Sequence, residues 1–259
     1  MNPKISVITI AYNCGKEIES TIISVIHQQY TNKEYILIDG GSTDNTMSIV
    51  GKYRQQIDVV ISEKDRGRSD AFNKGIQHAT GDYIVMMNAG DLLTENALQT
   101  FAENYREGYD VIKGNTIRWE ERTNCRTIER PVIRYHGIPF NFLVCHQSTY
   151  ISREAYKKYG CYDVNLHIAM DFDLMLRFTR REAKFMKIDS ELAVFRMGGI
   201  SQSSGKRRHH EMVQVLEKNG RNGLQIFTFS IYLHLRTLCR NILNMINPDL
   251  KNRIIEHVS

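Results

Sequence analysis

The chain has 259 residues, with 42% hydrophobic and 24% charged side chains and a formal net charge of +5. This length allows a substantial core and this composition excludes bulk disorder, so we expect one large α/β catalytic unit rather than two independent domains. Five cysteines without a C-x-x-C pair fit neither a disulfide framework nor a zinc knuckle, which favours a reducing cytoplasm. The first residues lack the apolar segment and cleavage site of a signal peptide, so we expect a cytoplasmic protein.

The first 113 residues alternate between strand-like and helix-like segments. Strands are predicted at residues 5–12, 35–39, 58–62, 83–87 and 110–113. Helices are predicted near residues 17–29, 44–55, 69–78 and 94–105, with Thr43 or Asp44 and Thr94 as helix caps. This regular alternation implies right-handed crossovers and a largely parallel sheet.

After residue 114 the pattern becomes mixed α+β. Short strands are predicted at residues 116–119, 125–129, 147–151, 184–188 and 192–195, and a helix at 171–180. A loop rich in Gly and Ser, expected to be mobile, covers residues 198–205. A polar helix near 206–219 and an amphipathic helix near 224–246 follow.

The positive charge is concentrated in the last part of the chain. From residue 201 onward nine Lys or Arg face four Asp or Glu, an excess that equals the whole net charge of +5. Such a region favours contact with phosphates or with an anionic membrane, or it is a solvated helical surface. The amphipathic helix is too interrupted by polar residues to span a bilayer. Adsorption to the inner face of the cytoplasmic membrane and a packed terminal helix or homodimer contact remain alternatives.

Two acidic turns point to the first functional hypothesis. Asp39 and Asp91 each follow a buried strand, and open α/β sheets bind ligands at the carboxyl ends of their strands. A nucleotide site is therefore expected, although the first turn has neither G-x-G-x-x-G nor a phosphate-binding loop. A divalent ion on Asp91 would neutralise the phosphates instead. The simpler interpretation of Asp91 is a turn or cap residue.

Four ordered segments resemble the motifs of family-2 glycosyltransferases. The segments are ISVITIAYN at residues 5–13, DGGSTDNT at 39–46, the stretch from Gly67 to Gly75, and NAGD at 88–91. The resemblance continues through MDFDLMLR at residues 170–177 and thus covers roughly residues 4 to 200. Three features differ from the family pattern. Gly40 stands where a second aspartate is common, and Met170 replaces the glutamate that usually precedes the position of Asp171. The acidic element before Asp91 is reduced to Asn88 and Gly90.

The resemblance implies a GT-A fold, in which a mostly parallel, Rossmann-like nucleotide-binding sheet is fused to a mixed α+β acceptor-binding half. The expected parts are residues 1–113 for the nucleotide sugar, 114–205 for the acceptor and catalysis, and 206–259 as a basic helical tail. Donor-binding positions that the resemblance implies are Thr9, Ala11, Tyr12, Asp39, Arg66 and Asp70, with Arg68 as a rival to Arg66. Tyr12 would stack on the base and Asp39 would hydrogen-bond it.

The same resemblance implies the catalytic roles. Asp91 matches the metal-binding acid, with Mg²⁺ or Mn²⁺ as cofactor, and Asp171 matches the catalytic base. An acid at a helix N-terminus is also favoured by the helix dipole, which is the structural alternative for Asp171. Asn88, His146 and Arg196 are candidates for contacts with the donor sugar or the acceptor, while a histidine at position 146 is as often a structural residue.

The expected function is an inverting, metal-dependent glycosyltransferase that moves a sugar from a nucleotide sugar, UDP-linked by expectation, to a saccharide or lipid-linked glycan of the cell surface. The alternative from another class is a non-catalytic sugar-nucleotide-binding or scaffold subunit of a glycan assembly complex. A sugar nucleotidyltransferase is disfavoured because its glycine-rich, basic N-terminal loop is missing. We expect no nucleic-acid partner.

Overall fold

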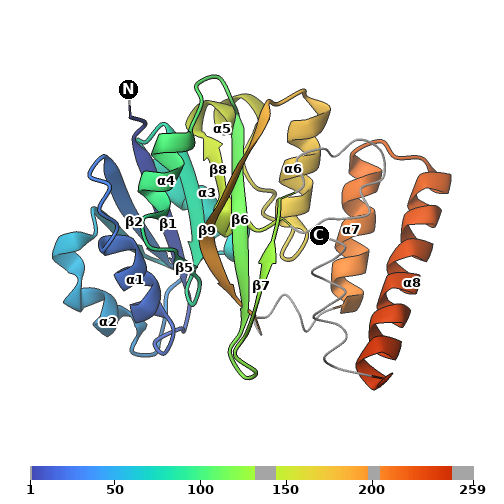
Figure 1. Cartoon of the computed structure of the whole chain (residues 1–259), viewed down its shortest axis with the longest axis horizontal. Coiled ribbons are helices and arrows are strands. Elements are labelled where there is room, and N and C mark those ends of the chain that lie inside the picture. Colours follow the sequence, from blue (N-terminus) through green and yellow to red (C-terminus); the bar gives the residue numbers. More distant parts are fainter. Residues whose placement is uncertain (1, 132–143, 198–204, 247–259) are drawn as a thin grey trace.

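The computed structural model describes residues 2–131, 144–197 and 205–246 (Figure 1). Its centre is a nine-stranded mixed sheet in the order β3-β2-β1-β4-β8-β6-β9-β5, with β7 paired to β6. The strands are β1 (Ile5–Ala11), β2 (Lys33–Asp39), β3 (Val59–Ser62), β4 (Tyr83–Asn88), β5 (Leu92–Leu93), β6 (Val111–Glu120), β7 (Cys125–Glu129), β8 (Thr149–Ser152) and β9 (Phe185–Arg196).

The first four strands in sequence pair in parallel, which confirms the predicted α/β half. β1 lies between β2 and β4, and all six of its side chains from Ile5 to Ile10 are buried because helices cover both faces of the sheet. The second half is mixed, as expected: β8 is antiparallel to β4 and β6, whereas β9 runs parallel to β6. The strands of the two expected halves thus form one continuous sheet, and residue 113 lies inside β6.

The helices divide between the two faces of the sheet. One face packs against α1 (Ile18–Ile26), α2 (Thr46–Lys52) and α4 (Ala97–Asn104). The other packs against α3 (Arg68–His78), α5 (Arg153–Tyr159) and α6 (Met170–Arg180). Beyond α6 lie α7 (Gly205–Lys218) and α8 (Gly223–Ile246), seen as a helical pair beside the sheet in Figure 1. Short 3₁₀ helices are η1 (Arg54–Gln56) and η2 (His146–Ser148).

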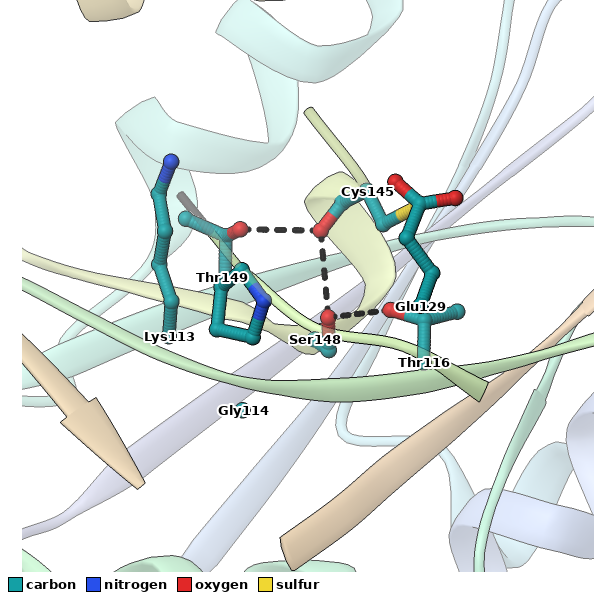
Figure 2. Close-up of a pocket in the computed structure, with 8 residues that line it drawn as sticks. Lys113, Gly114, Thr116, Glu129, Cys145, Ser148 and Thr149 are labelled. Atoms are coloured by element: carbon teal, nitrogen blue, oxygen red, sulfur yellow. Dashed lines mark hydrogen bonds between the residues drawn. The ribbon is translucent and has the colours of Figure 1, made fainter. Parts of the chain in front are cut away.

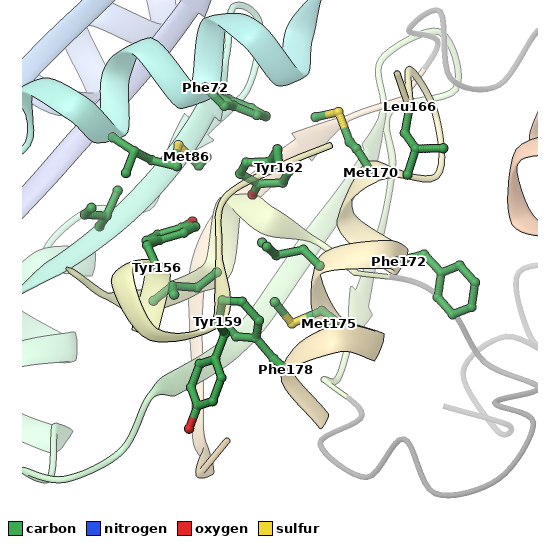
Figure 3. Close-up of a cluster of buried hydrophobic side chains, with 14 of the residues drawn as sticks. Phe72, Met86, Tyr156, Tyr159, Tyr162, Leu166, Met170, Phe172, Met175 and Phe178 are labelled. Carbon is green, nitrogen blue, oxygen red and sulfur yellow. The ribbon is translucent and has the colours of Figure 1, made fainter. Parts of the chain in front are cut away.

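The core around α6 joins the two expected halves. Phe72 from α3 lies 5.3 Å from the ring of Tyr162, and both side chains are buried together with Met170 at the start of α6 (Figure 3). α7 joins the same core through Val215 and α8 joins it through Phe229, both fully buried. The helices of the tail therefore belong to the core of the protein rather than to a separate appendage.

Two pairs of predicted strands are single strands, which corrects the prediction. Residues 110–113 and 116–119 belong to β6, because Gly114 lets the backbone pass close to β9. A Cβ at Gly114 would lie only 2.4 Å from the Cδ1 of Leu192. Residues 184–188 and 192–195 belong to β9, whose polar middle is paired with β6 through Glu191 opposite Asn115.

The predicted helix caps were wrong. α2 begins at Thr46 and α4 at Ala97, both later than predicted. The residues just before these helices are Asn45 and Asn96. The hydroxyl of Thr94 donates instead to the carbonyl of Glu191, and Asp44 accepts a turn hydrogen bond from the Thr46 N–H. α5 was missed, although its N-cap Ser152 accepts a hydrogen bond from the Ala155 N–H.

The tail helices were predicted within a residue at each end. None of the helices within residues 2–131, 144–197 and 205–246 has both the length and the apolar composition that a bilayer span requires. The predicted glycine-rich loop at 198–205 lies outside the described residues, apart from Gly205 at the start of α7. All five cysteines are free thiols.

Candidate active site

The carboxylate of Asp91 is buried and held by three donors. It follows β4, is 3% exposed, and accepts hydrogen bonds from the side chains of Asn88 (3.1 Å) and Gln147 (2.6 Å) on Oδ2. Its Oδ1 accepts one from the backbone N–H of Arg196 (3.1 Å), at the end of β9. Burial raises the pKa of Asp91, and the hydrogen bond from Gln147 is the largest opposing influence. This turn thus links β4, η2 and β9.

His146 lies between the two acids that the sequence singled out. Its Nε2 is 2.9 Å from the Nδ2 of Asn88, and its Nδ1 is 3.1 Å from the Oδ2 of Asp171. The side chains of His146 and Asp171 are only 12% and 18% exposed. A row of four polar side chains therefore runs from Asp91 through Asn88 and His146 to Asp171.

Asp171 is the second residue of α6, and its two carboxylate oxygens differ in their surroundings. The Oδ1 atom is buried and has no hydrogen-bond partner among the described residues. Asp173, its neighbour on the helix, instead forms an ion pair with Arg177 at 2.8 Å. Of the two acids in the first turn of α6, Asp173 is thus neutralised by an arginine, whereas Asp171 has only the imidazole of His146 as an ion-pair partner among the described residues.

The loop that leads into Asp171 is held by Glu211 of α7. Its Oε2 accepts hydrogen bonds from the backbone N–H groups of His167 (3.0 Å), Ile168 (2.7 Å) and Ala169 (3.0 Å), and Arg207 pairs with its Oε1 at 3.0 Å. Glu211 is 4% exposed. Burial acts to raise its pKa, but these backbone N–H groups and Arg207 hold the pKa below its ordinary value. No local sequence pattern predicts this long-range contact.

The predicted nucleoside positions lie at the carboxyl ends of β1 and β2. Tyr12 follows β1 with its side chain 63% exposed, so its ring is free to stack on a base. The backbone carbonyl of Ala11 accepts from the Gly40 N–H at 2.9 Å. Thr9 is fully buried and accepts a hydrogen bond from the hydroxyl of Tyr35 at 3.1 Å.

Asp39 is fully buried and organises the turn that follows β2. Its oxygens accept hydrogen bonds from the N–H groups of Gly41 and Ser42 and from the hydroxyls of Ser42 and Ser62. Gly40 departs from the family pattern at a crowded position, where an added Cβ would lie 2.5 Å from the Oδ2 of Asp65. The turn is thus shaped by its own side chains before any ligand binds.

The segment after β3 carries the remaining donor candidates. Arg66 and Asp70 form an ion pair at 2.9 Å, with the arginine side chain 71% exposed. The guanidinium of Arg68 donates instead to the carbonyl of His167. Farther along α3, Asn73 makes two hydrogen bonds to the backbone of Tyr162, at 2.9 and 3.0 Å. α3 is thereby fastened to the segment that precedes α6.

Arg196 lies beside the Asp91 end of the row of four polar side chains. Its backbone contacts Asp91, and its guanidinium lies 5.1 Å from the ring centre of Trp119 on β6. The structure therefore places five predicted residues together, namely Asn88, Asp91, His146, Asp171 and Arg196. Gln147 completes the group, and its place beside His146 in the sequence was the available signal.

A small polar pocket lies behind η2 (Figure 2). Lys113 extends along one side of it, and Glu129, Cys145 and Ser148 lie on the other. Burial lowers the pKa of Lys113 to about 7, while nearby acidic groups including Asp171 act in the opposite direction. Burial also raises the pKa of the Cys145 thiol. The pocket thus brings a buried lysine, a thiol and a carboxylate together behind η2.

The chemistry of the Asn88–Asp91 turn suits a divalent ion. Within the described ranges no three His, Cys, Asp or Glu side chains gather into a group that could hold a metal. The Oδ1 of Asn88, however, is buried without a hydrogen-bond partner among those residues, beside the Asp91 carboxylate. Amide and carboxylate oxygens are the hard ligands that Mg²⁺ and Mn²⁺ accept.

An exposed tyrosine after β1, acidic turns after β2 and β4 and a half-buried His–Asp pair thus lie on an α/β sheet whose first four strands in sequence are parallel. Solved structures have the same fold. The mannosyltransferase PcManGT from Pyrobaculum calidifontis, in complex with GDP-Man and Mn²⁺, matches with a TM-score of 0.67 and 17% identity, over 91% of this chain and 71% of that one. TarS from S. aureus, in complex with UDP-GlcNAc, gives 0.64 and 16% over 89% and 70%. The GT-A fold prediction is confirmed.

The sequence comparison specifies the family. The profile described as Glycosyl transferase family 2 matches residues 6–162, and the chain belongs to this family. Glycosyltransferase GlyG of Streptococcus pneumoniae is 34% identical over 125 residues, which cover 47% of this chain and 42% of the relative. The putative glycosyltransferase EpsE of Bacillus subtilis is 31% identical over 190 residues, with 68% and 66% covered. This chain spans less than two thirds of either relative.

Proposed function

We propose that the chain is an inverting glycosyltransferase that transfers a sugar from a nucleotide-sugar donor, UDP-linked, to a saccharide or lipid-linked glycan acceptor in the synthesis of a surface polysaccharide. The observation that carries the proposal is the buried, unpartnered Oδ1 of Asp171 at the end of a polar row that begins at the Asp91 turn. Family membership and the two nucleotide-sugar complexes of the same fold support it.

The chemistry follows from this placement. The acceptor oxygen attacks the anomeric carbon from the side opposite the nucleoside diphosphate, and the bond from that carbon to the phosphate oxygen breaks. The hydroxyl proton passes to Asp171, which acts as the general base. Tyr12 would stack on the base, with Asp39, Thr9 and Ala11 shaping that end of the site. Arg66 and Asp70 would lie along the donor, and Arg196 beside the sugar or the acceptor.

Mg²⁺ or Mn²⁺ is proposed as cofactor, held by oxygens of Asp91 and Asn88. Such an ion would supply positive charge beside the departing diphosphate. The unpartnered Oδ1 of Asn88 supports this assignment, as does the Mn²⁺ in the mannosyltransferase complex. The two remaining nitrogen contacts of the turn, from Gln147 and the Arg196 backbone, would keep the carboxylate in place.

We also propose that α8 contacts an anionic membrane surface. Leu224, Phe227, Ile231, Leu235 and Leu238 are exposed and recur at intervals of three and four residues, so they share one face of the helix. Residues 223–246 contain no Asp or Glu, which suits a surface of negative charge. Salt-sensitive binding to phosphatidylserine vesicles should disappear when the exposed Phe227 and Leu235 are replaced by serine, which leaves the buried Phe229 of the same helix in place. If the wild-type protein is a dimer in solution and does not bind vesicles, the exposed face of α8 is a homodimer contact instead.

A donor panel separates the enzyme from the non-catalytic alternative. Release of nucleoside diphosphate from UDP-GlcNAc and GDP-Man is measured with and without Mn²⁺, for the wild type, Asp171→Asn and Asp91→Asn. The proposal expects turnover that depends on metal and falls in both variants. A wild type that binds UDP but releases no nucleotide from any donor, with or without acceptors, would support a sugar-nucleotide-binding scaffold.

A further inference from the structure

Each hydrogen bond in the row from Asp91 to Asp171 has a defined donor and a defined acceptor. We infer that His146 is a positioning residue that donates its Nδ1 proton to Asp171, and that Asn88 and Asp91 select the imidazole tautomer that makes this possible. This inference rests on the proposed function, since it gives Asp171 the role of base. It assigns to His146 a role toward the base rather than toward the sugar.

The tautomer follows from donors and acceptors along the row. The Asp91 carboxylate accepts hydrogen bonds, so the Asn88 group that faces it at 3.1 Å is the amide Nδ2. That nitrogen has a second hydrogen and no available lone pair, so it donates to the Nε2 of His146 at 2.9 Å. Nε2 is therefore unprotonated and the ring proton lies on Nδ1, which points at Asp171 Oδ2 at 3.1 Å.

The hydrogen-bonded η2 turn and the packed ring of Phe72 hold His146 in place. The carbonyl of Cys145 accepts hydrogen bonds from the side chains of Thr149 at 2.8 Å and Ser148 at 3.3 Å, which closes the η2 turn. Thr116 of β6 bonds the hydroxyl of Ser148 from the adjacent strand (Figure 2). Phe72 packs against the imidazole with its ring centre 5.4 Å away. The imidazole therefore has little freedom to turn away from Asp171.

The hydrogen bond from His146 distinguishes the two carboxylate oxygens of Asp171. His146 occupies Oδ2, and Oδ1 is left without a partner among the described residues. The buried phenol of Tyr162 also lies beside this carboxylate. A carboxylate held at Oδ2 presents its other oxygen in one direction, which is what a base must do to meet the acceptor hydroxyl. The same hydrogen bonds explain why an amide rather than an acid suits position 88. An acid at this position would accept from Nε2–H, and the proton aimed at Asp171 would be lost.

Two isosteric substitutions separate the two nitrogens of the ring. The amide nitrogen of Asn overlays imidazole Nδ1, and that of Gln overlays Nε2. His146→Asn should therefore retain the donor to Asp171, whereas His146→Gln should lose it. With UDP-GlcNAc and GDP-Man as donors, we expect kcat to fall about 100-fold in His146→Gln and only about tenfold in His146→Asn. KM for the donor should change less than twofold in both, and His27→Gln is the matched control, because the exposed His27 directly follows α1.

A purely structural role for His146 would lower kcat equally in the Asn and Gln variants, and that result would overturn the inference. The tautomer is read independently from long-range ¹H–¹⁵N spectra of wild-type protein labelled on histidine, with the His146→Asn spectrum assigning the signal. A signal from Nδ1–H supports the inference and one from Nε2–H contradicts it. If the wild type releases no nucleotide from any donor, the proposed function fails while the spectrum still tests the hydrogen-bonded row.

Discussion

Replacement of Glu211 tests whether α7 builds the active site. Glu211→Ala removes the acceptor of three backbone N–H groups in the loop before Asp171. The N–H of Ala169 is buried and the other two are partly buried. Each buried donor left without an acceptor costs about 1–3 kcal/mol. Because water can reach two of the three in part, we expect a total loss of about 3–5 kcal/mol in the free energy of unfolding.

Glu211→Gln is the graded variant and Glu217→Ala the matched control. The glutamine retains an oxygen for the backbone N–H groups and loses the charge, so we expect a loss of about 1–2 kcal/mol. Glu217 is on the same helix with an exposed side chain, and its replacement should cost less than about 0.5 kcal/mol. Urea titrations at pH 7 measure all three values.

Turnover gives a second readout of the same perturbation. Since this loop leads directly into Asp171 at the start of α6, Glu211→Gln should reduce kcat about tenfold at a temperature where the variant is fully folded. A loss of stability in Glu211→Ala no larger than that in Glu217→Ala would refute the reasoning. So would an unchanged kcat in Glu211→Gln.

Three further predictions concern single side chains. Burial acts to raise the pKa of Glu34, but hydrogen bonds from Ser6 and Thr80 lower it to about 2. Its stabilisation is therefore present above pH 4.5 and lost as the pH falls toward 2, so Glu34→Gln should flatten the loss of unfolding free energy between pH 5 and 3 in urea titrations. Because the pKa of Lys113 is lowered to about 7, the unfolded chain binds more protons than the native protein above that pH. Stability should rise between pH 7 and 10 by at most about 1.4 kcal/mol per pH unit, and Lys113→Met should abolish the rise; an equal slope in both proteins would contradict this. Tyr12→Ala should weaken UDP binding in calorimetry by about tenfold or more and Tyr12→Phe by less than about twofold, because base stacking contributes about 1–3 kcal/mol; equal losses would exclude stacking.

The sequence predicted the parts of the fold that depend on local patterns. Apolar runs bounded by polar turns located the four parallel strands, and the motif order placed Asp39, Asp91 and Asp171 at the sheet edge and at the start of α6. Strand continuity could not be predicted in the same way. Gly114 resembles a strand end in the sequence, yet the close approach of Leu192 on β9 is what requires a glycine there.

The contacts within the site were beyond local reasoning for a similar reason. His146 and Asp171 are 25 positions apart, and Asn88 and His146 are 58 apart. Their residue types made these side chains candidates for the site. Only the packing of η2 between β4 and α6 decides that the Nδ1 of His146, and not its Nε2, faces Asp171. Glu211 looked like one charge of a polar helix, and its role depends on α7 packing against α6.

The central claim is that Asp171 is the base of a nucleotide-sugar-dependent transfer. The most direct test compares wild type with Asp171→Asn in the release of nucleoside diphosphate from UDP-GlcNAc and GDP-Man with Mn²⁺, alongside UDP affinity. Asparagine keeps the size of the side chain and cannot accept the proton. The account predicts that kcat falls about 100-fold or more while UDP binding stays within about twofold. Turnover by Asp171→Asn at the wild-type rate would contradict it.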